Sequence, residues 1–332
     1  MSQLAESRHV QYRRRYIADF ERFSEVFPEW EGSFTQMSRG RFQGHVNLTA
    51  CGDLRAFEAN TNQSILTKGS GDPASVAFVP ITPRNEQTSW HGKSIVRGGL
   101  IIKGTEAVYN NHTVRDTQIR ALIVTAEVVQ NALRILAGDC AHHDLTTWQA
   151  VHPSPDAMAM FQVCLSTLLG GSTGAFDRTM LEQECLRRLV DMLISTDGAP
   201  IVVRQSANRF RLVARVSDYI RERLGEPISA FDLCSEFGVS DRLLRLAFRE
   251  TYGMGPIAYS RLMRLHAVRN ALIAERGRDT SVAEVMDAFG ITRLGAFASE
   301  YKRHFGETPS VTLGVRGWSG VQAMTREELG QR

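Results

Sequence analysis

The spacing of hydrophobic residues changes along the chain and divides it into regions. Residues 9–27 place apolar side chains such as Tyr16, Phe20 and Phe23 at helical intervals, which predicts a helix that ends before Pro28. From residue 34 to about 129, short β-favouring stretches alternate with Gly, Pro, Asn and Asp clusters, which predicts a small barrel or sandwich. The predicted strands are residues 45–48, 54–58, 75–79, 94–96, 100–102 and 119–125.

Two apolar-rich helical patterns follow, at residues 156–169 and 176–195, and a glycine-rich stretch separates them. They predict a helical hairpin. In its second helix Leu181, Cys185 and Leu189 begin an apolar stripe that is broader than a single surface helix requires. Two explanations stay open for this stripe: packing against the β-rich region, or an interface with a second copy of the chain.

Residues 227–253 contain the pattern of a helix-turn-helix. Ser229 is placed to cap a short helix, Gly238 to form the tight turn, and Ser240 to cap a second helix that runs to about residue 250. The residues of the second helix predicted to face inward are Leu243, Leu244, Ala247 and Phe248. Those predicted to face outward are Asp241, Arg242, Arg245 and Arg249. Because arginine pairs bidentately with guanine and a recognition helix reads bases mainly through its first two turns, Arg242 and Arg245 are best placed for bases.

A second copy of this pattern occupies residues 280–306. It has a serine-led helix, a turn at Gly290, a predicted cap at Thr292, and Phe297 and Tyr301 as inward anchors. Between the copies, residues 256–273 predict one long helix that joins the two units rigidly. Two recognition helices on one rigid helix imply neighbouring segments of the major groove, roughly 34 Å apart on DNA.

Residues 209–314 resemble the DNA-binding domain of the AraC/XylS family of bacterial transcription regulators. The matching residues are Ile228, Leu233, Gly238, Ser240, Leu244, Phe248, Gly253, Pro256, Tyr259, Arg264, Leu265, Gly290, Phe297, Tyr301, Lys302, Phe305, Gly306 and Pro309. The resemblance implies an all-helical domain with two helix-turn-helix units, usually in an activator. It also implies that an N-terminal cupin-like barrel often binds a small effector and that an adjoining helical segment dimerises.

The chain departs from the family pattern at three places in the recognition helices. Leu246 stands where many members carry a basic residue, Gly295 lies inside the second recognition helix, and Ser299 replaces the usual arginine. We therefore expect sequence specificity to rest mainly on the first unit, and the second to rely on Arg293 and on phosphate contacts from its basic end, including His304. The expected DNA contacts are Ser240, Asp241, Arg242, Arg245, Arg249, Arg264, Thr292, Arg293, Leu294, Lys302 and Arg303.

Composition narrows the class of protein. The chain has 332 residues, of which 43% are hydrophobic and 23% charged, as in a globular protein. Residues 209–316 hold 17 Lys or Arg against 13 Asp or Glu, an excess that permits a polyanionic partner. No apolar run is long enough to cross a membrane, and the N-terminus lacks the apolar core of a secretory signal, which favours a cytoplasmic protein. The family resemblance implies that this protein is bacterial.

The chain shows no pattern of a known catalytic or metal site. The five cysteines form no C-x-x-C pair, and neither His45 nor His91 belongs to an H-x-H motif followed by Glu. The remaining cluster of possible ligands is Cys140, His142, His143 and His152, whose spacing is wrong for one metal ion. A nucleophile elbow, a phosphate-binding loop and a dinucleotide fingerprint are also missing. We expect no enzyme activity, catalytic residue, metal or cofactor.

A small-molecule effector is the expected ligand of the N-terminal region, because a barrel encloses an apolar pocket with a few polar anchors. The candidate pocket residues are Phe57, Glu58, Asn60, Trp90, Lys93 and Tyr109, with Trp148 as a further aromatic wall. A carboxylate beside aromatic rings suits an amine, whereas a lysine suits an acid. The sequence leaves the identity of the effector open.

These patterns together predict an α+β multidomain chain. The predicted parts are a β-rich effector-binding domain at 1–155, a helical hairpin at 156–195, a linker at 196–208, a DNA-binding domain at 209–316 with helix-turn-helix units at 229–250 and 280–303, and a tail at 317–332. The expected function is effector-responsive regulation of transcription, usually activation, by a homodimer that contacts promoter DNA and RNA polymerase. The alternatives are a constitutive dimeric regulator, a repressor that uses the same surfaces, and a cupin-type metalloenzyme fused to a DNA-binding domain.

Overall fold

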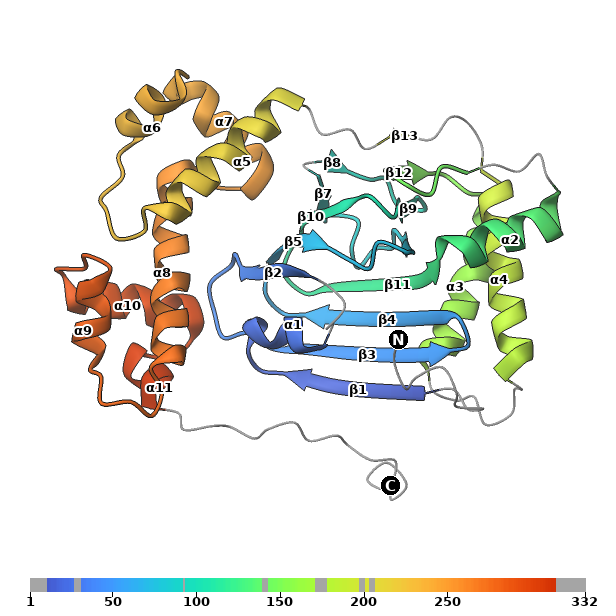
Figure 1. The fold of residues 1–332 in the computed structure, drawn as a ribbon, viewed down its shortest axis with the longest axis horizontal. Helices are drawn as coiled ribbons and strands as arrows, with labels where there is room; N and C mark the ends of the chain where they lie inside the picture. The colour runs from blue at the N-terminus through green and yellow to red at the C-terminus, as the bar shows by residue number, and fades with distance from the viewer. Residues whose placement is uncertain are drawn as a thin grey trace.

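The computed structural model describes residues 11–26, 31–91, 93–138, 143–170, 178–196, 201–202 and 207–314. Within them, the N-terminal part combines two antiparallel β-sheets with a layer of helices, and the C-terminal part is helical (Figure 1). The predicted division into a β-rich region followed by a helical region is confirmed. The predicted tail at 317–332 and most of the predicted linker at 196–208 lie outside the described residues.

The larger sheet contains eight strands. In spatial order they are β1 (Gln11–Ile17), β3 (Gly44–Cys51), β4 (Leu54–Thr61), β11 (Thr117–Thr125), β6 (Ser75–Pro80), β9 (Leu100–Lys103), β12 (Trp148–Val151) and β13 (Ile201–Val202). The last strand belongs to the predicted linker and pairs with β12.

The smaller sheet contains five strands and faces the larger one. Its order is β2 (Glu31–Gln36), β5 (Ile65–Ser70), β10 (Val108–His112), β7 (Ser89–Trp90) and β8 (Lys93–Ser94). Phe57 and Ala121 from the larger sheet are buried in one core with Ile65 and Trp90 from the smaller sheet. Each sheet ends in edge strands of its own, so the two do not close into a barrel, and the expected cupin-like barrel is not confirmed.

Three helices cover the outer face of the larger sheet. They are α2 (Ala126–Ala137), α3 (Pro155–Leu169) and α4 (Arg178–Ile194) (Figure 1). Helices α3 and α4 correspond to the predicted hairpin, whereas α2 was not predicted. The stripe that begins with Leu181, Cys185 and Leu189 is buried in a core shared with the sheet, so this stripe is core packing and not a free surface.

The predicted N-terminal helix is wrong over most of its length. Residues of β1 pair antiparallel with β3, and only the short segments η1 (Phe20–Arg22) and α1 (Phe23–Val26) are helical. Phe20 and Phe23 are buried as expected, but Tyr12 and Tyr16 are 41% and 45% exposed. The apolar spacing of residues 11–17 was therefore fortuitous, and backbone pairing with β3 decided the structure.

The C-terminal region consists of seven helices among the described residues. They are α5 (Ala207–Glu222), α6 (Ala230–Phe237), α7 (Asp241–Tyr252), α8 (Pro256–Ala274), α9 (Val282–Ala288), α10 (Leu294–Phe305) and α11 (Pro309–Gly314). Helix α8 forms the expected connection, with α6 and α7 near one end and α9 and α10 near the other (Figure 1). Within the part of the chain described, no helix combines the length and apolar character needed to cross a bilayer.

Candidate nucleic-acid interface

The first helix-turn-helix unit, α6 and α7, is stabilised by caps at both helix starts. The Ser229 hydroxyl accepts a hydrogen bond from the backbone N–H of Asp232 at 3.2 Å, and the Asp232 carboxylate accepts one from the Ser229 N–H at 2.9 Å. Gly238 adopts φ +61°, the left-handed conformation that the turn requires. Ser240 caps α7 by accepting from the Leu243 N–H at 3.2 Å. The predicted motif is therefore present with its predicted caps.

The inner face of α7 anchors this helix in the domain. Leu244, Ala247 and Phe248 have no exposed surface and pack in a core with residues of α5 and α8. Leu243 was predicted to be buried but is 36% exposed. It lies one residue, or about 100° around the helix, from Leu244, which turns its side chain toward the edge of the buried face.

The outer face of α7 presents its arginines to solvent. Arg242, Arg245 and Arg249 are all exposed. Arg245 pairs with Asp241, one turn earlier, at an Nε–Oδ2 distance of 2.7 Å, and this contact raises the pKa of Arg245. The side chains of Arg242 and Arg249 make no ion pair or hydrogen bond with the described residues. An exposed pair such as Asp241–Arg245 is weak, so Asp241 does not hold the Arg245 guanidinium firmly.

The second unit, α9 and α10, starts its recognition helix differently. Ser281 and Glu284 form a capping box at α9, and Gly290 makes the turn at φ +64°. The N-cap of α10 is Arg293, and no side chain caps it. The predicted cap at Thr292 is wrong, because helical backbone begins one residue too late for its hydroxyl to reach the first turn.

Helix α10 exposes fewer charged side chains than α7 does. Thr292, Arg293 and Leu294 are exposed at its start, where Gly295 adds no side chain. Further along, the Ser299 hydroxyl donates to the Gly295 carbonyl at 2.9 Å. Beyond Arg293, the exposed cationic side chains of this helix are Lys302 and Arg303, near its C-terminal end.

His304 was predicted to contact phosphate, and this prediction is wrong. The side chain is 4% exposed, and its Nε2–H donates to the Gln36 carbonyl of β2 at 3.2 Å. His266 of α8 donates to the same carbonyl at 2.9 Å. Burial lowers the pKa of His266 to about 3 and that of His304 to about 4, so both rings are neutral near pH 7.

Arg264, a predicted DNA contact on α8, is half-buried in the structure. Its Nη2 donates to the backbone carbonyl of Glu226, just before α6. Burial lowers the pKa of its guanidinium. Arg264 therefore ties α8 to the first unit, and a DNA contact by this residue stays a prediction.

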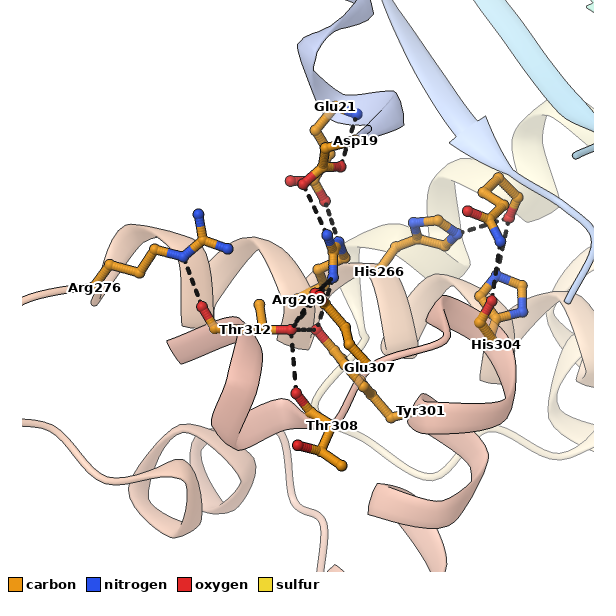
Figure 2. A network of polar contacts seen from close by, with 11 residues as sticks. Asp19, Glu21, His266, Arg269, Arg276, Tyr301, His304, Glu307, Thr308 and Thr312 are labelled. Carbon is orange, nitrogen blue, oxygen red and sulfur yellow. Dashed lines mark hydrogen bonds and ion pairs between the residues drawn. The ribbon is translucent and has the colours of Figure 1, made fainter. Parts of the chain in front are cut away.

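Arg269 of α8 is the centre of an ion-pair network that the sequence analysis missed (Figure 2). Its side chain is 7% exposed, and Nη2 lies 2.8 Å from Asp19 of the N-terminal region. On the other side, Nη1 lies 3.3 Å from the hydroxyl of Tyr301 in α10 and 2.5 Å from Glu307, which follows α10. The network joins α8, the second unit and the N-terminal region. An arginine between Leu265 and Leu272 on the apolar side of a helical pattern was the available signal.

Glu21 also faces this network, at 3.5 Å from the Arg269 Nε. Burial and the neighbouring Asp19 raise the pKa of Glu21 to about 7, even though Arg269 acts in the opposite direction.

A second polar contact joins β5 of the N-terminal region to α7. The Lys68 Nζ donates to the Tyr252 hydroxyl at 2.7 Å, and burial lowers the pKa of Lys68 to about 8. The interface between the two regions thus buries several ionisable groups.

A cavity of about 70 Å³ lies between the two sheets. Two predicted pocket residues, Phe57 and Trp90, line it. Glu58 and Asn60 do not, because alternation along β4 points them to the outer face, where the Asn60 Nδ2 donates to Glu58 at 3.0 Å. There Glu58 also pairs with Arg120 at 2.7 Å. The side chains of Lys93 and Tyr109 lie outside the described residues.

Cys140 and His142 lie outside the described residues. Among the residues that are described, no three His, Cys, Asp or Glu side chains cluster closely enough to hold a metal ion.

Comparison with known proteins concerns mainly the C-terminal third. A helix-turn-helix domain model matches residues 233–314. The XylDLEGF operon transcriptional activator 2 of Pseudomonas putida is 35% identical over 101 residues, which cover 30% of this chain and 64% of that protein. A probable thc operon regulatory protein of Rhodococcus erythropolis is 28% identical over 102 residues, 31% of each chain. The matched segment thus spans less than two thirds of either relative.

Several solved structures match a similar share of the chain. One of them is a probable AraC family transcriptional regulator from Rhodopseudomonas palustris, with 33% sequence identity, a TM-score of 0.29, and coverage of 31% of this chain and 94% of that one. The matched helices include both helix-turn-helix units and α8. Residues 233–314 of this chain thus form a helix-turn-helix domain that is similar to a region of the XylDLEGF operon transcriptional activator 2.

Proposed function

We propose that the protein binds promoter DNA sequence-specifically, with α7 in the major groove, and regulates transcription. The observation that carries this proposal is the outer face of α7, where Arg242, Arg245 and Arg249 project from a capped helix whose opposite face is fully buried. Guanidinium groups at this position suit the guanine edge. The start of α7 also suits a phosphate, because its first backbone N–H groups and the helix dipole favour an anion.

The second unit has a supporting role in this proposal. Lys302 and Arg303 provide phosphate contacts, and Arg293 is the cation nearest the start of α10. Helix α8 has 19 residues and is about 28 Å long at 1.5 Å per residue. It therefore supports the two units at a separation suited to neighbouring segments of the major groove.

The N-terminal region is proposed to control this activity through a small effector in the cavity between the sheets. Phe23 lines the cavity, and Glu21, two residues earlier, faces Arg269. Phe34 lines the cavity as well, and Gln36, two residues later, accepts from both buried histidines. A ligand that moves these phenylalanines would shift the population of arrangements between the N-terminal region and the DNA-binding domain.

Activation through RNA polymerase and homodimer formation complete the proposal. Exposed apolar side chains on α3 and α4 support a dimer, namely Met160, Val163, Met180 and Ile194. A dimer would place two DNA-binding domains on one promoter. The same exposed side chains also fit the alternative, a constitutive regulator whose N-terminal region only dimerises.

Transcription in vitro from a promoter that carries a selected binding site tests the proposal. The template is transcribed with purified bacterial RNA polymerase, with and without the full chain, and a template with a scrambled site is the control. An activator raises the transcript several-fold only from the intact site. A decrease from that site would make the protein a repressor, and equal transcript from both templates would contradict sequence-specific regulation.

A further inference from the structure

The cavity between the sheets has an apolar wall and a small polar corner. Aromatic side chains Phe23, Phe34 and Phe57 contribute much of the wall. Trp90 of β7 and Asn111 of β10 also line the cavity. They are direct register partners across the two strands, so their side chains extend from the same face of the smaller sheet as neighbours.

These two neighbours carry unsatisfied hydrogen-bonding groups. Trp90 is 2% exposed and Asn111 is 7% exposed. Neither the Trp90 Nε1–H nor the Asn111 Oδ1 has a hydrogen-bond partner among the described residues. A buried donor or acceptor without a partner is costly and rare in folded proteins. One donor and one acceptor, side by side on a cavity wall, define a complementary ligand group.

We infer that this cavity binds a small uncharged molecule with an apolar body and one hydroxyl group. The hydroxyl oxygen accepts from the Trp90 Nε1–H, and its proton is donated to the Asn111 Oδ1. A carboxylate has no proton to donate to Asn111, and an ammonium has no lone pair to accept from Trp90. This inference rests on the proposed role of the cavity as the effector site and adds the chemical class of the effector.

The surroundings of the cavity favour an uncharged ligand. None of the described residues that line it carries a formal charge. Glu58 lies on the other face of β4, and Lys103, the register partner of Ala77, is on the inner face but does not line the cavity. A bare charge would lose its hydration without an opposite charge beside it. The volume of 70 Å³ corresponds to about five water-sized positions, so the body of the ligand is small.

Binding of three simple aromatic probes to the full chain tests this inference. Phenol has the hydroxyl, toluene has no polar group, and benzoate is charged at pH 7. Titration calorimetry, supported by saturation-transfer NMR, is expected to show phenol binding about tenfold or more tightly than toluene, because toluene leaves both polar groups unpaired. Benzoate is expected to bind more weakly than phenol. Equal or tighter binding of toluene, or tightest binding of benzoate, would overturn the inference.

Two variants assign the effect to the polar corner. Trp90→Phe removes the donor and Asn111→Leu removes the acceptor, and each is expected to reduce phenol affinity about tenfold while leaving toluene affinity nearly unchanged. Asn47→Leu is the matched control. Asn47 also has a buried amide oxygen without a partner, but it lies outside the cavity. If Asn111→Leu fails to fold, the phenol affinity of Trp90→Phe is the deciding measurement. Unchanged phenol affinity in that variant overturns the inference.

DNA binding by the same preparations separates this inference from the proposed function. If phenol binds as expected but leaves affinity for the selected DNA site unchanged, the ligand class stands and the effector role fails. If DNA binding is specific while phenol binds no better than toluene, the ligand class fails and the DNA-binding function stands.

Discussion

The two helix-turn-helix units have the same arrangement of helices. Their recognition helices differ in their caps, in their exposed arginines and in the contacts that fix their position. Helix α7 starts at a serine cap, carries three exposed arginines and is anchored by Leu244 and Phe248 within the DNA-binding domain. Helix α10 starts without a side-chain cap, and near its buried end His304 contacts Gln36 of the N-terminal region while Tyr301 contacts Arg269 of α8. The recognition helix of the first unit thus presents more exposed arginines, and that of the second makes more hydrogen bonds to the N-terminal region.

This difference suggests how regulation could act on a duplicated motif. The first unit shares a core with Met37 and Leu66 and accepts a hydrogen bond from Lys68 at Tyr252, but among the described residues its recognition helix makes no ion pair with the N-terminal region. A unit that depends on Arg269 and on the Gln36 carbonyl changes position when those contacts change. Control of the second unit alone would alter affinity for DNA without altering which bases the first unit selects.

Loss of Arg269 should give the largest change in the free energy of unfolding among these variants. Arg269→Leu leaves Asp19, Glu21 and Glu307 without their buried partner, and we expect a loss of about 3 to 5 kcal/mol in the free energy of unfolding. Denaturant titration measures it. Arg278→Leu is the control, since the Arg278 side chain is 68% exposed beside Glu275 and its loss should cost less than about 0.5 kcal/mol. Similar losses in the two variants would contradict a central role for Arg269.

Single arginines should separate base reading from phosphate contact. Arg242→Ala is expected to cost about 1 to 3 kcal/mol on the selected DNA site and much less on random DNA. Arg293→Ala, the counterpart in the second unit, is expected to cost under about 1 kcal/mol and equally on both DNAs. Fluorescence anisotropy at fixed salt measures both. An equal loss on both DNAs for Arg242→Ala would reduce this residue to a phosphate contact.

Acid should weaken the contacts of the second unit through the buried histidines. Their folded pKa values of about 3 and 4 lie below the ordinary 6.5, so the stability they contribute is complete above pH 6.5 and is lost as pH falls toward 4. At pH 5 the loss is about 2 kcal/mol per histidine. Arg269 and Arg39 face His304 and reinforce this direction.

The matched variant for this effect is His304→Gln, which keeps an N–H donor but does not titrate. Between pH 7 and pH 5 it should lose about 2 kcal/mol less unfolding free energy than the parent chain. Glu21 has a raised pKa of about 7 and acts in the opposite direction, but it is present in both proteins and cancels in the difference. Identical pH profiles would show that His304 does not stay neutral in the folded chain.

Gly295→Ala should give the smallest change in stability, and its effect on DNA affinity tests how closely the second recognition helix approaches DNA. No atom lies within 4 Å of a Cβ at this position, and its backbone is not left-handed, so alanine should stabilise the chain by about 0.5 kcal/mol near the start of α10. Thermal unfolding measures the change. Unchanged DNA affinity would agree with a supporting role for α10, whereas a tenfold loss would mean that its backbone approaches DNA closely at Gly295.

The sequence predicted best where local chemistry decides the structure. Ser229, Gly238 and Ser240 mark the first unit because each supplies a cap or a left-handed turn that the backbone needs. Several strands were found as well, since β4 and β11 carry clear β-favouring patterns. In the second unit Thr292 resembled a cap, but its position relative to the helix start depends on the tertiary path of the turn.

Long-range pairing set the limit of prediction. Strand β1 forms by pairing with the edge of β3, and the sequence of residues 11–17 does not by itself indicate this pairing. Glu58 could be assigned to the cavity or to the outer face only once the direction of Phe57 was known. The contact of Arg269 with Asp19 joins residues 250 positions apart, which a local pattern does not reveal.

Selection of bound fragments from a random DNA pool with the full chain tests whether the two units divide their roles. We expect an asymmetric site across two neighbouring major grooves, in which base preference is concentrated in the half contacted by α7 and is reduced by Arg242→Ala. The other half should tolerate most substitutions, with or without Arg293→Ala. Equally strong base preference in both halves would contradict the division of roles between the two units.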